Sequence, residues 1–226
     1  MSKPVRPLLL TGFEAFDGAT GNPSAVLLDA LRAERFGPAA TPVETLLLPV
    51  SFQSAAAGLR RRLQHPARPA PCAVVALGLA GNRHQITLER VAINLIDARI
   101  PDNAGRQPID VPVRRGGPAA HFATLPLKRM LAAALERALP VALSLSAGSF
   151  VCNALFYHLL DTLAGTRIPA GFIHVPWLPD QAPVATGTAV PPALPLAVQL
   201  GALRVLLHAA LAAPTRGPRF SAGSES

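Results

Sequence analysis

The chain has 226 residues, half of them hydrophobic and 15% charged, with a formal net charge of +8. This composition excludes a disordered chain, and the length suits one domain with a substantial core. The apolar stretches are interrupted before the roughly 20 residues that a bilayer span needs, so we expect no membrane partner.

The amino-terminal segment MSKPVRPLLLTGFEAF has a short apolar run and no cleavage site of small residues, which predicts a first strand and not a signal peptide. Two cysteines outside a secreted chain, Cys72 and Cys152, are typical of free thiols. We therefore expect a cytoplasmic protein. Arginine clusters such as 60–62 have no aromatic-basic or helix-turn-helix pattern around them, which favours a solvated basic surface, and we expect no nucleic acid partner.

Apolar runs and capping signals predict strands that alternate with helices along the chain. The strands or extended segments are expected at 8–11, 43–50, 72–78, 86–96, 141–146 and 170–176. The helices are expected at 24–36, 52–64, 125–139, 149–164 and 192–213. We expect a single α/β domain over residues 1–213 and a disordered tail over 214–226.

This alternation predicts a three-layer α/β/α fold with a mostly parallel twisted central sheet. Ligands of such sheets bind at the carboxyl ends of the strands. Four loops follow predicted strands and are expected to share that edge, namely 12–22, 78–83, 147–152 and 174–180.

Cys152 is a candidate nucleophile because it follows a predicted strand, an Ala-Gly turn and the start of a helix. Unpaired N–H groups at a helix start stabilise a thiolate and can receive an oxyanion. The alternative is a buried structural cysteine, and position alone does not decide between the two. Cys72 begins an apolar strand and is interpreted as a core residue.

His174 ends a predicted strand, so its ring belongs at the same edge as Cys152. A thiol and an imidazole are the minimum for nucleophilic acyl transfer. Glu89 stands between apolar residues, so we expect it to be buried and therefore paired. Its partner is either a nearby arginine, Arg90 or Arg99, or His174, and the residue pattern leaves this open.

No metal-binding pattern such as HExxH or CxxC is present in the sequence. The segment GLAGNR is a glycine-containing turn after a strand, but it matches neither a phosphate-binding loop nor GxGxxG. We therefore predict that the protein uses neither a metal nor a cofactor.

With these residues in view, the sequence resembles the pyroglutamyl peptidase I (pyrrolidone carboxyl peptidase) family between about residues 8 and 182. The blocks that carry the resemblance occur in family order, as LLLTGFEAFDGATGNPS, LGLAGNRHQITLERVAINLIDARIPDNAG, HFATLPLK, SAGSFVCN and GFIHVPWLPDQ. A chance match of five such blocks is hard to credit.

The resemblance implies a catalytic triad of Cys152, His174 and Glu89. It also implies that Arg99 in DARIPDN assists the Cys152 N–H as an oxyanion group. The residues implied for the substrate pocket are Phe13 and Phe16 as walls, Asn22 as a loop support, and Phe150 and Val151 beside the thiol.

The implied activity is that of an omega peptidase, which removes N-terminal pyroglutamate from peptides through a thioester. Hydrolysis of another small amide and a non-catalytic binding relative are the alternatives. The family also implies a homo-oligomer, a tetramer or a dimer. Three positions depart from its common pattern, with Asp17 and Asn82 where glycine is usual and Leu145 where asparagine is usual.

Overall fold

The computed structural model describes residues 5–183, 191–213, 218 and 220–222. Nine strands and five helices are assigned within these residues. The strands are β1 (Leu8–Phe13), β2 (Arg35–Phe36), β3 (Thr41–Leu48), β4 (Ala73–Leu79), β5 (Ile86–Glu89), β6 (Val91–Ile93), β7 (Ala120–Phe122), β8 (Val141–Ser144) and β9 (Ala170–Val175). The helices are α1 (Pro23–Leu31), α2 (Phe52–Leu63), α3 (Leu127–Leu135), α4 (Val151–Thr162) and α5 (Leu196–Leu211).

Seven strands form the central sheet in the order β2-β3-β1-β4-β9-β5-β8. Most neighbours are parallel, while β2 with β3 and β5 with β9 are antiparallel. The predicted mostly parallel sheet is therefore confirmed. The antiparallel strand β5 is important for the site, because it brings the end of β5 alongside β9.

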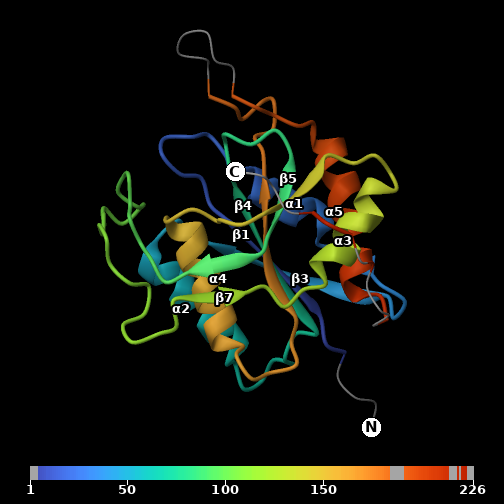
Figure 1. The fold of residues 1–226 in the computed structure, drawn as a ribbon, viewed down its shortest axis with the longest axis horizontal. Coiled ribbons are helices and arrows are strands. Elements are labelled where there is room, and N and C mark those ends of the chain that lie inside the picture. Colours follow the sequence, from blue (N-terminus) through green and yellow to red (C-terminus); the bar gives the residue numbers. More distant parts are fainter. Residues whose placement is uncertain (1–4, 184–190, 214–217, 219, 223–226) are drawn as a thin grey trace.

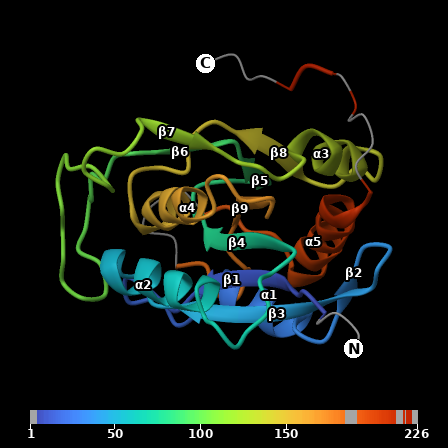
Figure 2. The same ribbon diagram turned by 90° about the horizontal axis from the view of Figure 1, so that it is seen from below.

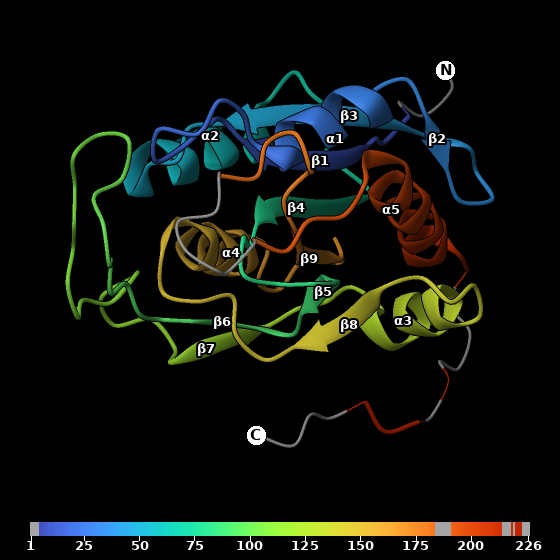
Figure 3. The same ribbon diagram turned by 90° about the horizontal axis from the view of Figure 1, so that it is seen from above.

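Helices cover both faces of this sheet, as the edge-on views show (Figures 2 and 3). Helices α1, α3 and α5 pack on one face and α2 and α4 on the other. Alternation along β1 explains the two cores, since Leu8 and Leu10 face the first layer and Leu9 faces the second. The predicted three-layer α/β/α fold is confirmed.

Three sequence predictions of local structure were wrong. The helix expected over 24–36 ends at Leu31, and residues 35–36 instead form the short edge strand β2. The extended segment 86–96 divides at Arg90 into β5 and β6, which lie in two different sheets. Strand β7 was not predicted. Its three residues pair only with the equally short β6, and so few residues carry little periodic signal.

The carboxyl-terminal segment lies partly outside the described residues, at 214–217, 219 and 223–226. Of the rest, Phe220 contacts α3, where its carbonyl accepts a hydrogen bond from Lys128 Nζ at 2.8 Å. The same ammonium lies 4.8 Å from the centroid of the Phe220 ring. Disorder of 214–226 and a single domain over 1–213 stay predictions. None of the described helices is long and apolar enough to cross a membrane.

Asn153 connects helix α4 to the segment around β6, close to the candidate nucleophile in the chain. Its fully buried carboxamide accepts from Ile93 N at 3.0 Å and donates to the carbonyls of Ile93 and Leu95 at 2.9 and 3.0 Å. Because Asn153→Ala leaves three backbone groups without this partner, we expect the free energy of unfolding to fall by about 3 kcal/mol. Urea denaturation measures the change.

The matched control is Asn103→Ala, which removes one exposed hydrogen bond to the Ala15 carbonyl and should cost under about 1 kcal/mol. A loss in Asn153→Ala no larger than in this control would contradict the bridging role of Asn153.

Candidate active site

Cys152 is the second residue of α4, immediately after the loop that follows β8. That loop turns at Gly148, whose φ of +79° is accessible to glycine at little cost. The helix begins at Phe150 without a side-chain cap, so no capping side chain occupies the N–H groups of its first turn. The half-buried thiol therefore lies beside backbone donors that can receive an oxyanion.

The resting thiol is protonated at neutral pH. Burial, followed by the nearby negative charge of Glu89, raises the pKa of Cys152 to about 12, and Arg83 acts in the opposite direction. The sequence predicted a thiolate stabilised by the helix start, and the structure differs because it favours the protonated thiol. A thiolate here must form as its proton moves to a neighbouring base.

His174 and Glu89 form a buried pair on adjacent strands. In the antiparallel register of β5 and β9, Thr87 lies opposite His174 and Glu89 opposite Phe172. His174 Nδ1 lies 2.8 Å from Glu89 Oε1, with the two residues 4% and 0% exposed. The open choice of partner for Glu89 is thus answered by His174, together with an arginine that was not considered, Arg83.

This geometry fixes the tautomer of the imidazole. A carboxylate at Nδ1 requires that Nδ1 carries the proton, so Nε2 keeps a lone pair. Burial lowers the pKa of His174 against the opposing effect of Glu89. Burial would raise the pKa of Glu89, but the hydrogen bond from His174 contributes to a net lowering. At neutral pH the pair is therefore a carboxylate and a neutral imidazole, which is the state of a general base.

Gly78 allows the thiol and the histidine strand to approach each other. It lies opposite His174 in the parallel register of β4 and β9. A Cβ at this position would lie 2.7 Å from Phe172 Cζ and 3.0 Å from Cys152 Sγ. A larger residue would push the sulfur and the aromatic ring apart. The sequence marked Gly78 only as the end of a strand.

A cavity of about 680 Å³ opens beside the thiol, and we call it the Cys152 cavity. Each of the four loops that the sequence placed at one edge contributes residues to its lining. The predicted residues among them are Phe13, Phe16, Asn22, Arg99, Phe150, Val151 and Cys152. Lining residues that the sequence analysis did not select include Trp177 and Gln181, although both lie within the block GFIHVPWLPDQ.

Aromatic rings form one wall of the Cys152 cavity. The ring centroids of Phe150 and Phe16, which both line the cavity, are 5.3 Å apart. The ring of Phe52 lies outside this lining and packs against Phe150 with a centroid distance of 5.2 Å. Asn22 caps α1, since its Oδ1 accepts from Ser24 N at 3.0 Å while its Nδ2 donates to the Glu14 carbonyl at 3.0 Å. These contacts are those of a loop support.

The three departures from the family pattern are exposed and leave the His174–Glu89 contact in place. Asp17 has a φ of +54°, which explains why glycine is usual there and why aspartate is tolerated. Asn82 follows the turn at Gly81, and Leu145 is 59% exposed.

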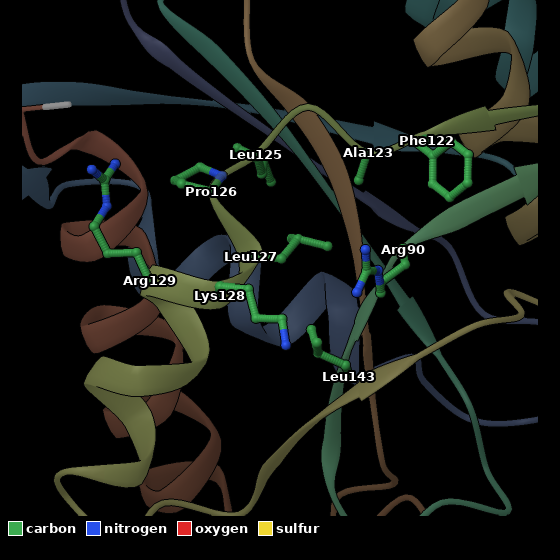
Figure 4. Close-up of a pocket in the computed structure, with 9 residues that line it drawn as sticks. All are labelled: Arg90, Phe122, Ala123, Leu125, Pro126, Leu127, Lys128, Arg129 and Leu143. Carbon is green, nitrogen blue, oxygen red and sulfur yellow. The ribbon is translucent and has the colours of Figure 1, made fainter. Parts of the chain in front are cut away.

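A second hollow of about 400 Å³ lies between α3 and the segment around β7 (Figure 4). Its basic residues are Arg90, Lys128 and Arg129, but the guanidinium of Arg129 points away and donates to carbonyls at the end of α5, including those of Ala209 and Ala213. Lys128 Nζ donates a hydrogen bond to the Phe220 carbonyl. This hollow has no thiol, histidine or carboxylate in its lining, so it lacks the groups for acyl transfer, whereas the Cys152 cavity has a thiol.

Comparison with known proteins shows the family of the chain. The family model described as pyroglutamyl peptidase matches residues 6–213. The pyrrolidone-carboxylate peptidase of Chromobacterium violaceum is 51% identical over 79% of this chain and 81% of its own. That of Bacillus subtilis is 44% identical over 88% and 90%.

Solved structures agree. Pyroglutamyl peptidase I of Bacillus amyloliquefaciens has a TM-score of 0.82 and 39% identity, covering 91% of this chain and 97% of its own. A mutant pyrrolidone carboxyl peptidase of Pyrococcus furiosus has a TM-score of 0.84 and 36% identity, covering 91% and 98%. The resemblance seen in the sequence blocks is thereby confirmed, and the chain belongs to the pyroglutamyl peptidase family.

Proposed function

We propose that this protein is a cysteine peptidase that removes pyroglutamate from the amino terminus of peptides. The observation that carries the proposal is the Cys152 cavity, which has a thiol at a helix start and an aromatic wall. The buried His174–Glu89 pair lies on the strands next to it, since Gly78 is opposite His174 and a Cβ there would lie 3.0 Å from Cys152 Sγ. Membership of the pyroglutamyl peptidase family supports the same activity.

The chemistry follows from the tautomer of His174. Nε2 accepts the proton of Cys152 as the sulfur attacks the pyroglutamyl carbonyl carbon, which forms a tetrahedral oxyanion. The Cys152 N–H and Arg99 are the proposed donors to that oxygen. The imidazolium then protonates the departing amine as the C–N bond breaks. The same ring activates water, which hydrolyses the thioester and restores the thiol.

The cavity suits a pyroglutamyl ring, which is a flat, neutral lactam without an amino-terminal charge. Phe13, Phe16, Phe150 and Val151 are proposed as apolar walls, and Asn22 as the support of the loop that follows Phe13 and carries Phe16. A free peptide amino terminus would bring a positive charge into these aromatic surroundings at a desolvation cost, and this disfavours ordinary peptides.

The test is hydrolysis of three fluorogenic amides that share one leaving group, with L-pyroglutamyl, L-prolyl and L-glutamyl acyl groups. We expect turnover of the pyroglutamyl amide and at least about 100-fold lower kcat/KM for the other two, because they bring an ammonium group into the cavity. Turnover of a different small amide and not of the pyroglutamyl amide would favour the alternative, a hydrolase of another small amide. A folded protein that binds pyroglutamyl peptides without turnover would favour a binding relative.

Two further properties belong to the proposal. We infer a cytoplasmic location, in keeping with two free thiols at Cys72 and Cys152. We also infer a homo-oligomer, a tetramer or a dimer, in keeping with the exposed apolar side chains of Phe122 on β7 and Leu145 directly after the edge strand β8.

A further inference from the structure

We propose that Arg83 is a positioning residue of the triad, which holds the Glu89 carboxylate in place and ties it to the turn before the nucleophile helix. The proposal rests on the function given above, since it concerns the same site. Arg83 is not among the residues that line the Cys152 cavity, so it acts through Glu89 and not on the substrate.

One guanidinium joins two segments that are far apart in the chain. Arg83 Nη1 donates to Glu89 Oε1 and to Thr87 Oγ1, both on β5. Its Nη2 donates to the carbonyl of Ser146 at 2.8 Å, in the loop between β8 and α4. The planar fork of arginine makes both sets of bonds at once, which an ammonium group cannot reproduce.

These bonds hold the same oxygen of Glu89 that His174 contacts. The carboxylate is fully buried, and its Oε1 accepts hydrogen bonds from Arg83, from His174 and, at 3.3 Å, from the hydroxyl of Thr87. Without Arg83 the carboxylate loses its one charged arginine partner and keeps the imidazole and weaker hydroxyl groups such as that of Thr87. The ring orientation would then be less restricted, and the Nε2 lone pair would point at the thiol less often.

The charges of the cluster also depend on Arg83. The ionisable groups that face one another are Arg83 from the β4–β5 loop, Glu89 from β5, His174 from β9 and Cys152 from α4. The positive charge of Arg83 lowers the pKa of each of the other three groups. Removing it leaves the carboxylate unbalanced, so protons are held more tightly by all three.

The experiment compares Arg83→Gln and Arg83→Lys in a Cys72→Ser background, with kcat and KM measured against pH on the pyroglutamyl amide. Arg83→Gln should lower kcat at pH 7 about tenfold or more, leave KM within about twofold, and move the acid limb of the pH profile, which reports His174, to higher pH. Arg83→Lys should return this limb toward the wild-type position because it restores the charge. Its kcat should stay below wild type because the fork is lost.

The matched control is Arg137→Gln. It removes an exposed arginine that follows α3 and pairs with Glu136, and it should leave the pH profile of kcat unchanged. A folded Arg83→Gln variant whose acid limb stays at the wild-type pH would overturn the proposal. If Arg83→Gln does not fold, the Arg83→Lys variant tests the proposal alone. A wild-type kcat in Arg83→Lys would overturn the proposal, because it would show that the guanidinium fork is dispensable, and a reduced kcat would support it.

A second readout separates this proposal from the peptidase function. Alkylation of Cys152 by iodoacetamide against pH reports thiol ionisation without any substrate. Arg83→Gln should move this profile to higher pH. If wild type does not hydrolyse pyroglutamyl amides, the proposed function fails, while a shifted alkylation profile still supports the role of Arg83. An unshifted alkylation profile would overturn it.

Discussion

Cys152→Ser is expected to lower kcat/KM on the pyroglutamyl amide by at least about 10⁴-fold. The hydroxyl that replaces the thiol is a much weaker nucleophile in this setting, because His174 is the only neighbouring base proposed to take its proton. The side chains are nearly isosteric, so the cavity and the His174–Glu89 pair should persist. Initial rates on the fluorogenic amide measure the loss of kcat/KM, and thermal melting of each variant checks that the fold persists.

The chain offers a matched control in its other cysteine. Burial raises the pKa of Cys72, which lies on the opposite core layer from Cys152 and pairs its N–H with the Pro7 carbonyl at 2.8 Å. Cys72→Ser should keep kcat/KM within about twofold of wild type. Substantial turnover by Cys152→Ser, or loss of turnover in Cys72→Ser, would contradict the assignment of the nucleophile.

Much of this site could be predicted because its parts are local. A buried strand, a turn at Gly148 and an apolar helix start are all visible around Cys152, and the structure has β8, the turn and α4 in that order. The ends of strands β1, β4 and β9 carry the loops that line the Cys152 cavity, as the rule for parallel sheets predicts.

The rest depends on contacts between distant residues. The pattern around Glu89 indicated burial, but the choice between His174 and an arginine needed the register of β5 against β9, which a single sequence does not reveal. Arg83 was unremarkable in a polar loop until that register placed Glu89 and Ser146 beside it. The break at Arg90 also follows from tertiary pairing, since β6 pairs with β7 outside the central sheet (Figure 2; β7 is also labelled in Figure 1).

The ionisation of the Cys152 thiol also depends partly on local sequence and partly on contacts between distant residues. A helix start favours a thiolate, and this local effect is what the sequence could indicate. The opposing effects are burial and the charge of Glu89, and both arise only after β5 and α4 have packed against β9. The resting enzyme is therefore expected to hold a neutral thiol and to form the thiolate together with the imidazolium.

Glu89→Gln is the second variant expected to have a large effect, with kcat falling about 10³-fold. A neutral amide no longer stabilises the imidazolium that forms when His174 takes the thiol proton. It also presents an N–H₂ group that competes with Nδ1–H and Arg83, both of which need an acceptor at this position. KM should change little, because Glu89 does not line the Cys152 cavity.

Glu44→Gln is the matched control, because Glu44 is also a carboxylate paired with arginines but lies on β3. It accepts two hydrogen bonds from Arg62 and one, at 3.0 Å, from Arg68. Its loss should therefore lower the free energy of unfolding by about 1–3 kcal/mol and leave kcat near wild type. Equal falls of kcat in the two variants would mean that Glu89 acts only by stabilising the fold. A fall confined to Glu89→Gln, with the pyroglutamyl amide still bound, would assign its charge to the proton transfer between Cys152 and His174.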